Sequence, residues 1–134
     1  MRRASLRKRR WRSQAGVAAV EFALILPIFL ILLLGMMEYG YLYFVHLNMT
    51  NAAREGARVG VTQDSGGVVS GATLAAQRYL TAAGVQATIN PPTFDGTTLT
   101  VTISQNYQPL IGFVPTPPTL QASASMRWEL APPP

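Results

Sequence analysis

Gly16-Val17-Ala18-Ala19-Val20-Glu21-Phe22 opens an apolar run that continues to Met37. The 21 residues from Val17 to Met37 contain one charged side chain, that of Glu21. As an α-helix this run is about 31 Å long, which is enough to cross the hydrocarbon core of a bilayer. A carboxylate in a membrane helix costs roughly 2.5–3.5 kcal/mol at the centre and less near the end. Glu21 therefore indicates a functional residue, although an acid tolerated at the membrane interface stays open as the other interpretation.

The segment before this run is strongly basic. Seven of the eleven Lys and Arg residues of the chain lie there: Arg2, Arg3, Arg7, Lys8, Arg9, Arg10 and Arg12. An apolar helix follows directly, which disfavours nucleic-acid binding. Met36-Met37-Glu38-Tyr39 makes a poor signal-peptidase site, which disfavours a cleaved secretory signal. We favour a membrane anchor whose basic end stays in the cytoplasm while the C-terminal domain is exported.

Several features in the first 60 residues resemble type IV prepilins, and most closely the TadE-like pseudopilins of tight-adherence (Flp) pilus systems. They are, in order, Arg12 to Leu24 with its glycine and Glu-Phe pair, then Pro27, then Glu38-Tyr39-Gly40, then Ala52-Ala53-Arg54-Glu55-Gly56-Ala57-Arg58. The resemblance implies that a prepilin peptidase cuts between Gly16 and Val17, so that Glu21 becomes the fifth residue of the mature chain. It also implies roles in assembly for Glu21 and Phe22. The implied partners are other pilins and pseudopilins, an inner-membrane assembly platform and the lipid bilayer.

Removal of the predicted leader, residues 1–16, leaves four basic residues against six acidic ones. The mature chain then has no basic surface for nucleic acid. The helix is predicted to continue to Val61, because residues 48–61 contain no proline. Ala52, Gly56 and Gly60 recur every four residues and predict a close helix contact, within the head or with another helix. Tyr39, Tyr41, Tyr43 and Phe44 fit an aromatic belt at the outer membrane interface, or a protein contact.

Beyond the helix the pattern predicts a small α+β head. Residues 68–83 have helical spacing, with Val69, Ala72, Ala76, Tyr79, Leu80 and Ala83 on the apolar face and Gly84 as the stop. Three antiparallel strands are expected: residues 85–89, residues 99–103 after an Asp95-Gly96 turn, and residues 120–128. The loop from Tyr107 to Pro118 either caps the core or contacts a partner. A fragment from about Asn48 onward is expected to fold by itself.

The fold class that follows is α+β and type IV pilin-like, with a long membrane-spanning helix that carries a helix and a three-stranded sheet. The expected segments are a leader (1–16), a long helix (17–61, membrane span about 17–37), the head (62–130) and a proline tail (131–134). Acids are dispersed, cysteine is absent and His46 is the lone histidine, so we expect no enzyme, no cofactor and no metal. Two functions remain: a processed pseudopilin, or an uncleaved membrane-anchored binding or scaffold domain.

Overall fold

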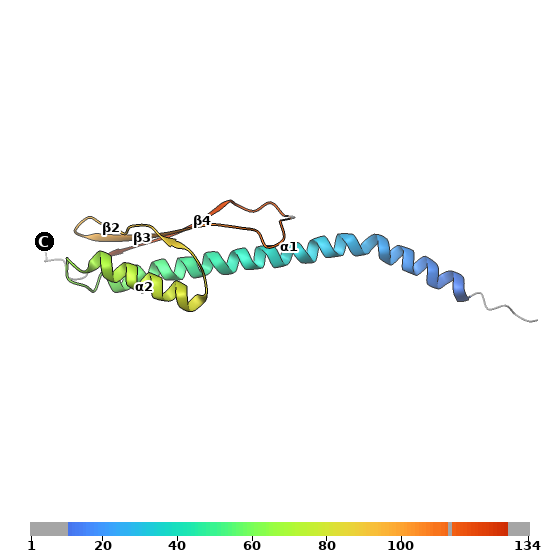
Figure 1. Ribbon diagram of the computed structural model, residues 1–134, viewed down its shortest axis with the longest axis horizontal. Coiled ribbons are helices and arrows are strands. Elements are labelled where there is room, and N and C mark those ends of the chain that lie inside the picture. Colours follow the sequence, from blue (N-terminus) through green and yellow to red (C-terminus); the bar gives the residue numbers. More distant parts are fainter. Residues whose placement is uncertain (1–10, 113, 129–134) are drawn as a thin grey trace, which may run out of the picture. The chain divides into compact units, whose positions relative to one another are not determined.

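The computed structural model describes residues 11–112 and 114–128 (Figure 1). Residues 1–10 of the predicted leader and the predicted tail, 131–134, lie outside the described residues. The chain divides into two compact units, Met1–Met37 and Glu38–Pro134. Their elements are α1 (Trp11–Gly60), α2 (Val68–Ala83), β1 (Thr88–Ile89), β2 (Thr93–Phe94), β3 (Thr98–Asn106) and β4 (Thr119–Arg127).

The first unit consists of the N-terminal part of α1. Most of its large apolar side chains from Val17 to Met37 are exposed, because no other element among the described residues of this unit packs against them. Among the described residues, the helical segment Gly16–Gly60 is the one long and apolar enough to cross a membrane. The helix continues through Pro27. A single N-terminal helix of this kind fits a single-pass membrane anchor, in which lipid replaces the missing protein contacts.

The second helix has the bounds that its spacing predicts. α2 ends at Ala83, and Gly84 adopts a left-handed conformation with φ 68°. Glycine adopts this conformation at little cost because it has no side chain. In it, the Gly84 N–H donates hydrogen bonds to the carbonyl oxygens of Leu80 and Thr81. Val68, Ala72, Ala76 and Leu80 are buried. Val69, which we expected on the apolar face, is 41% exposed, and its neighbour Val68 takes that place.

β3 is the central strand of an antiparallel sheet. It pairs with β4 from Thr98↔Arg127 to Asn106↔Thr119, and β1 and β2 pair with it as well. The predicted turn at Asp95-Gly96 joins β2 to β3: Oδ1 of Asp95 accepts N–H bonds from Thr97 (2.8 Å) and Thr98 (2.6 Å). The sheet thus has the predicted long strands.

The strand predicted at residues 85–89 is shorter than expected and is interrupted. Only Thr88–Ile89 is paired, and a second short strand, β2, follows Asn90-Pro91-Pro92. Between Ile89↔Ile103 and Thr93↔Thr100 the chain advances four residues against three on β3, so one extra residue bulges out. The prolines explain the interruption because they have no N–H to donate to a ladder. The sheet therefore contains four strands instead of three.

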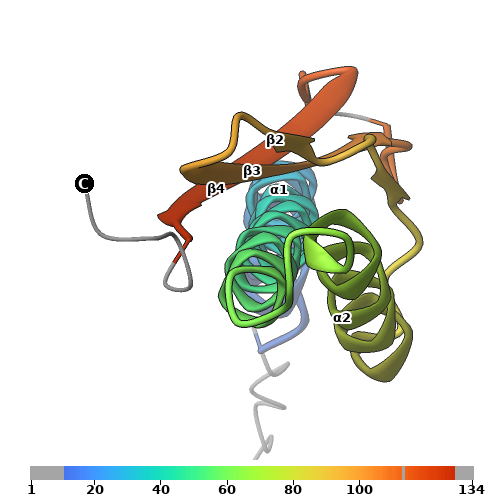
Figure 2. The same cartoon turned by 90° about the vertical axis from the view of Figure 1, so that its left-hand side faces the viewer.

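The core of the second unit lies between the sheet and two helices. Figure 2 shows the sheet across one side of α2 and of the C-terminal part of α1. Both helices and the sheet contribute buried side chains: Val45, Met49, Ala52, Ala53, Ala57 and Val61 from α1 and its end, Val68, Ala72, Ala76 and Leu80 from α2, and Leu99, Val101, Ile103, Leu120 and Ala122 from the sheet. The α+β, pilin-like fold class is confirmed. The core reaches back along α1 beyond Asn48, to Val45.

Candidate functional site

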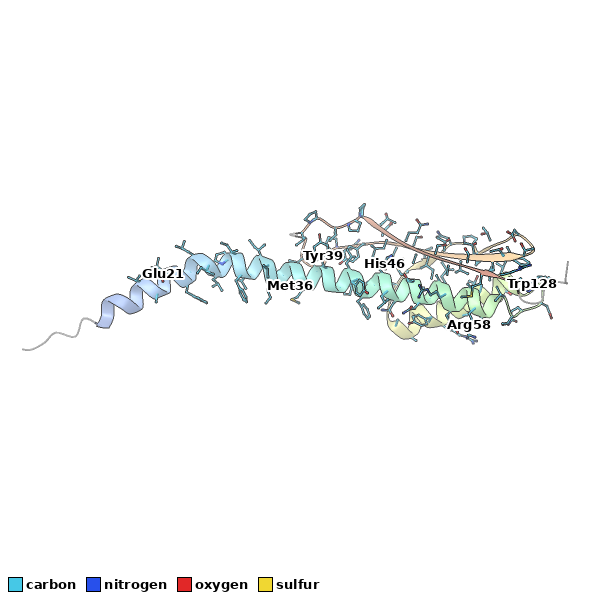
Figure 3. All side chains as sticks on the ribbon, turned by 180° about the vertical axis from the view of Figure 1, so that it is seen from behind. Glu21, Met36, Tyr39, His46, Arg58 and Trp128 are labelled. Atoms are coloured by element: carbon cyan, nitrogen blue, oxygen red, sulfur yellow. The ribbon has the colours of Figure 1, made fainter. Side chains whose placement is uncertain are left out.

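The predicted cleavage and assembly residues lie on the helical surface of the first unit. Gly16 and Val17 are both within α1, and apart from the adjacent turns of the helix no described part of the chain lies within 4 Å of a Cβ atom placed at Gly16. The side chains of Glu21 and Phe22 are exposed, and Glu21 is seen on the N-terminal part of the helix in Figure 3. These residues are therefore accessible along one apolar helix.

The small-residue stripe lies inside the head. Ala52, Gly56 and Gly60 are buried on α1. A Cβ atom on Gly56 would lie 2.9 Å from the Ala72 carbonyl oxygen, and one on Gly60 would lie 2.9 Å from the carbonyl oxygen of Val68. Backbones therefore approach closely between α1 and α2, at a distance that a side chain would prevent. In the described residues, Gly56 and Gly60 of this stripe are in contact with the chain's own second helix.

A buried carboxylate marks the first residue of the head. Glu38 is 0% exposed and is the one charged residue in the core of the described chain. Its Oε1 accepts hydrogen bonds from the Tyr107 hydroxyl (2.6 Å) and the Leu110 N–H (3.1 Å). Its Oε2 accepts the Ile111 N–H at 2.9 Å. Three donors from one loop therefore close over one carboxylate of α1.

The charge of Glu38 is balanced by hydrogen bonds alone. The one ion pair among the described residues joins Arg58 to Glu55 at 2.7 Å, elsewhere on α1. The sequence contains no charged residue between Asp95 and Arg127, so the loop that covers Glu38 has only neutral donors to offer. A buried carboxylate is costly unless its oxygens are hydrogen-bonded, and here the loop backbone supplies those bonds.

These bonds favour the ionised form of Glu38. The Tyr107 hydrogen bond is the largest influence and lowers the pKa of the Glu38 carboxyl; burial acts against it, and N–H groups of Ile111, Leu110 and Gly112 act with it. The pKa of Tyr107 is raised, first by burial and then by its bond to Glu38. At neutral pH the pair is therefore a carboxylate and a neutral phenol.

A second contact fixes the same loop. The Tyr39 hydroxyl donates a 3.1 Å hydrogen bond to the Pro115 carbonyl oxygen; Tyr39 is labelled on α1 in Figure 3. The ring of Tyr41 lies 6.3 Å from that of Tyr107. Of the two interpretations of the 107–118 loop, capping is therefore observed, because the loop closes on the helix of its own chain.

Sequence patterns alone did not single out Glu38 as a buried site. It was noted as part of Glu38-Tyr39-Gly40, but its donors lie 69 to 73 residues further on and leave no local signal. An acid at the end of an apolar run, together with a long uncharged segment containing a tyrosine, is the only hint. His46 is exposed, and no group of three or more His, Cys, Asp or Glu in residues 11–112 and 114–128 could hold a metal.

A long N-terminal apolar helix that continues into a small head of one helix and an antiparallel sheet defines the class of α+β, pilin-like proteins. The family model described as TadE-like protein matches residues 16–58. Over these residues the chain is similar to TadE-like proteins, which confirms the resemblance of the N-terminal motifs. The match includes Glu38 and ends before α2. No curated protein and no solved structure matches the chain significantly.

Proposed function

We propose that the chain is a pseudopilin, or minor pilin, that a prepilin peptidase cleaves between Gly16 and Val17 before assembly of a tight-adherence pilus. The observation that supports this most directly is where the family match begins. It starts at Gly16, the residue that precedes the apolar run from Val17 to Met37, and the only acid of that run follows five positions later at Glu21. The peptidase site would then directly precede the membrane span, and the assembly residue Glu21 would be the fifth residue of that span.

The proposed orientation places the basic N-terminus in the cytoplasm and the head outside. It is supported by the seven Lys and Arg residues ahead of the span, since positive charge near a span is retained on the cytoplasmic side. Besides the peptidase, the proposed partners are other pilins and pseudopilins, the inner-membrane assembly platform and lipid. Surface adhesion through the completed pilus is the proposed outcome.

Glu21 has the proposed role of setting how neighbouring helices dock. Cleavage would create an α-amine at Val17 that is mostly protonated at neutral pH. Glu21 lies about one helical turn from it and would also reach the amine of a neighbouring subunit. A paired carboxylate in an apolar bundle recovers part of its desolvation cost, whereas an unpaired one does not. The exposed Phe22 beside it would add apolar contact in the same bundle.

The proposed role is structural rather than catalytic. The conspicuous buried polar group of the described chain, Glu38, has each carboxylate oxygen engaged by the loop of its own head. An engaged carboxylate of this kind stabilises a fold and is poorly placed to exchange protons with a substrate. The second candidate, an uncleaved membrane-anchored scaffold, would contain the same head.

The test is the intact mass of the chain extracted from membranes of cells that contain a prepilin peptidase. We expect loss of residues 1–16 and a mature chain that begins at Val17. Gly16→Leu should abolish this loss, because a subsite that fits glycine excludes a branched side chain. Gly40→Leu is the matched control, since Gly40 lies on the same helix with open space around it. A wild-type chain that keeps its leader in the presence of the peptidase would contradict the proposal and favour the anchored scaffold.

A further inference from the structure

The loop over Glu38 directs its backbone inward and an apolar side chain outward. The N–H of Leu110 donates to Glu38, while the Leu110 side chain remains 60% exposed. Pro109 beside it and Tyr39 on α1 are also exposed. We call Tyr39, Pro109 and Leu110 the collar patch. All three lie at the Glu38 end of the head, because Tyr39 follows Glu38 and Leu110 is bonded to it.

The collar patch lies next to the residue that directly follows the predicted membrane span. Glu38 follows Met37, the last residue of that span, without a break in α1. The headgroup layer of a bilayer is about 5–8 Å thick on each side, and helix residues 38–42 rise through about 6 Å. A loop whose N–H groups lie 3.1 and 2.9 Å from the Glu38 carboxylate therefore falls within this layer.

The chemistry of the loop suits that layer. The segment from Gly96 to Met126 contains no charged residue, so no ion would have to leave water. Pro109, Pro115, Pro117 and Pro118 have no N–H, and the N–H groups of Leu110 and Ile111 are used by Glu38. Few donors of the loop would therefore lose a water partner near lipid.

Closure of the loop also removes the one charge that would oppose such a contact. An open Glu38 would present a carboxylate to anionic or apolar lipid groups, whereas the closed loop leaves it 0% exposed. Tyr39 adds an aromatic ring with a polar tip, the kind of side chain enriched at the membrane interface. The same three hydrogen bonds therefore bury the charge and present an apolar surface.

We propose that the collar patch is a second membrane contact: with α1 inserted, Leu110 enters the boundary between headgroups and acyl chains of the outer leaflet and holds the head against the bilayer. This inference rests on the single-pass anchor of the proposed function but not on cleavage at Gly16. The occupant is lipid rather than a second copy, because Tyr39 lies two residues after the end of the predicted span and the Leu110 N–H is bonded to Glu38, the residue directly after that span.

The test uses single-cysteine variants of the full chain, which contains no cysteine of its own. Leu110→Cys carries a fluorophore in nanodiscs that hold one copy each, prepared from phosphatidylcholine and phosphatidylglycerol brominated near the top of the acyl chain. The matched control is Leu74→Cys on α2, since Leu74 is 59% exposed. Leu74 shares a groove with Glu55 and Val59. Glu55 lies about 26 Å from Glu38 along α1. Ile28→Cys, within the span and 69% exposed, reports insertion.

We expect quenching of the Leu110→Cys label to exceed that of the Leu74→Cys label by at least about threefold, because lipid quenching does not reach across about 26 Å. Far-UV circular dichroism of both variants verifies that each head is folded. Strong quenching of the Ile28→Cys label with equal, weak quenching at the other two positions overturns the collar contact and leaves the anchor intact. Absence of quenching at Ile28→Cys overturns both the anchor and the collar contact.

Discussion

The Tyr107 hydroxyl donates a 2.6 Å hydrogen bond to Oε1 of Glu38, and thereby joins two residues that lie 69 positions apart. Tyr107 is the first residue after β3, and Glu38 is the first residue of the compact head. The bond closes the head at the end where α1 enters it. The Tyr107 hydroxyl and the loop N–H groups donate to the carboxylate and favour its ionised form. The contribution of Glu38 to stability therefore depends on its remaining ionised.

The first prediction concerns the stability of the head at low pH. The folded pKa of Glu38 is lowered, so its contribution is present above the ordinary value of 4.5 and is lost as the pH falls through the folded pKa. The fragment 35–134 should therefore show a lower Tm as the pH falls from about 5. Starting at Gly35 keeps the terminal amine away from Glu38.

Glu38→Gln is the control for this pH dependence. Arg58 lowers the pKa of Glu55, and the N–H groups of Thr98 and Thr97 lower the pKa of Asp95. These two groups therefore contribute to acid unfolding in the wild-type fragment and in the variant alike. The variant should have a Tm lower by several degrees at pH 7, because an amide group faces donors. Its Tm should fall less steeply with acid. Parallel acid slopes for the two proteins would refute the role of Glu38.

The second prediction concerns where the head begins. A fragment 35–134 should fold alone, whereas a fragment from Asn48 lacks Glu38 and the buried Val45. Losing the burial of one valine costs about 1.5–3 kcal/mol, and the loop donors lose their acceptor. We expect a Tm lower by about 10 °C or more for the shorter fragment, measured by far-UV circular dichroism. Equal Tm values would show that α1 residues before Asn48 do not stabilise the head.

A third prediction tests the close approach of α1 and α2. Gly60→Ala places a Cβ 2.9 Å from both the Val68 carbonyl oxygen and the Ala72 Cβ, and against Leu99. We expect a loss of about 1–3 kcal/mol in the free energy of unfolding, because a packed core resists extra volume. Gly66→Ala is the control, since nothing lies within 4 Å of that position. Urea unfolding of the fragment 35–134 measures both, and equal midpoints would contradict the packing.

The fourth prediction separates processing from assembly. Glu21→Gln removes the charge that we propose to pair with the new amine at Val17, but it leaves the peptidase site and the apolar run unchanged. The variant should be inserted and cleaved like wild type and should be absent from purified pili. Mass spectrometry of membrane extracts measures cleavage, and immunodetection in pili measures incorporation. Normal incorporation of the processed variant would show that Glu21 has no pairing role.

Local patterns were sufficient for the two helices and the two long strands of this fold. The apolar run from Val17 to Met37, the helical spacing of residues 68–83 with Gly84 behind it, and the alternation along residues 120–128 each carry their signal within a few neighbours. The structure has α2 with the predicted bounds and β4 with the predicted faces. The break at Pro91-Pro92 was visible too, but the short strand after it was not, because its pairing depends on β3.

The sequence alone indicated a basic N-terminus, a membrane-length helix with one acid and an α+β head, since composition and periodicity are local properties. Its N-terminal motifs carried the resemblance to TadE-like proteins. Tertiary structure was needed to show that Glu38 is buried, that the 107–118 loop closes over it, and that Gly56 and Gly60 face α2. A carboxylate next to an apolar run has the same local pattern whether it faces water or a loop. Which of the two it meets depends on donors about 70 residues away, and only the folded chain brings them within 3.1 Å.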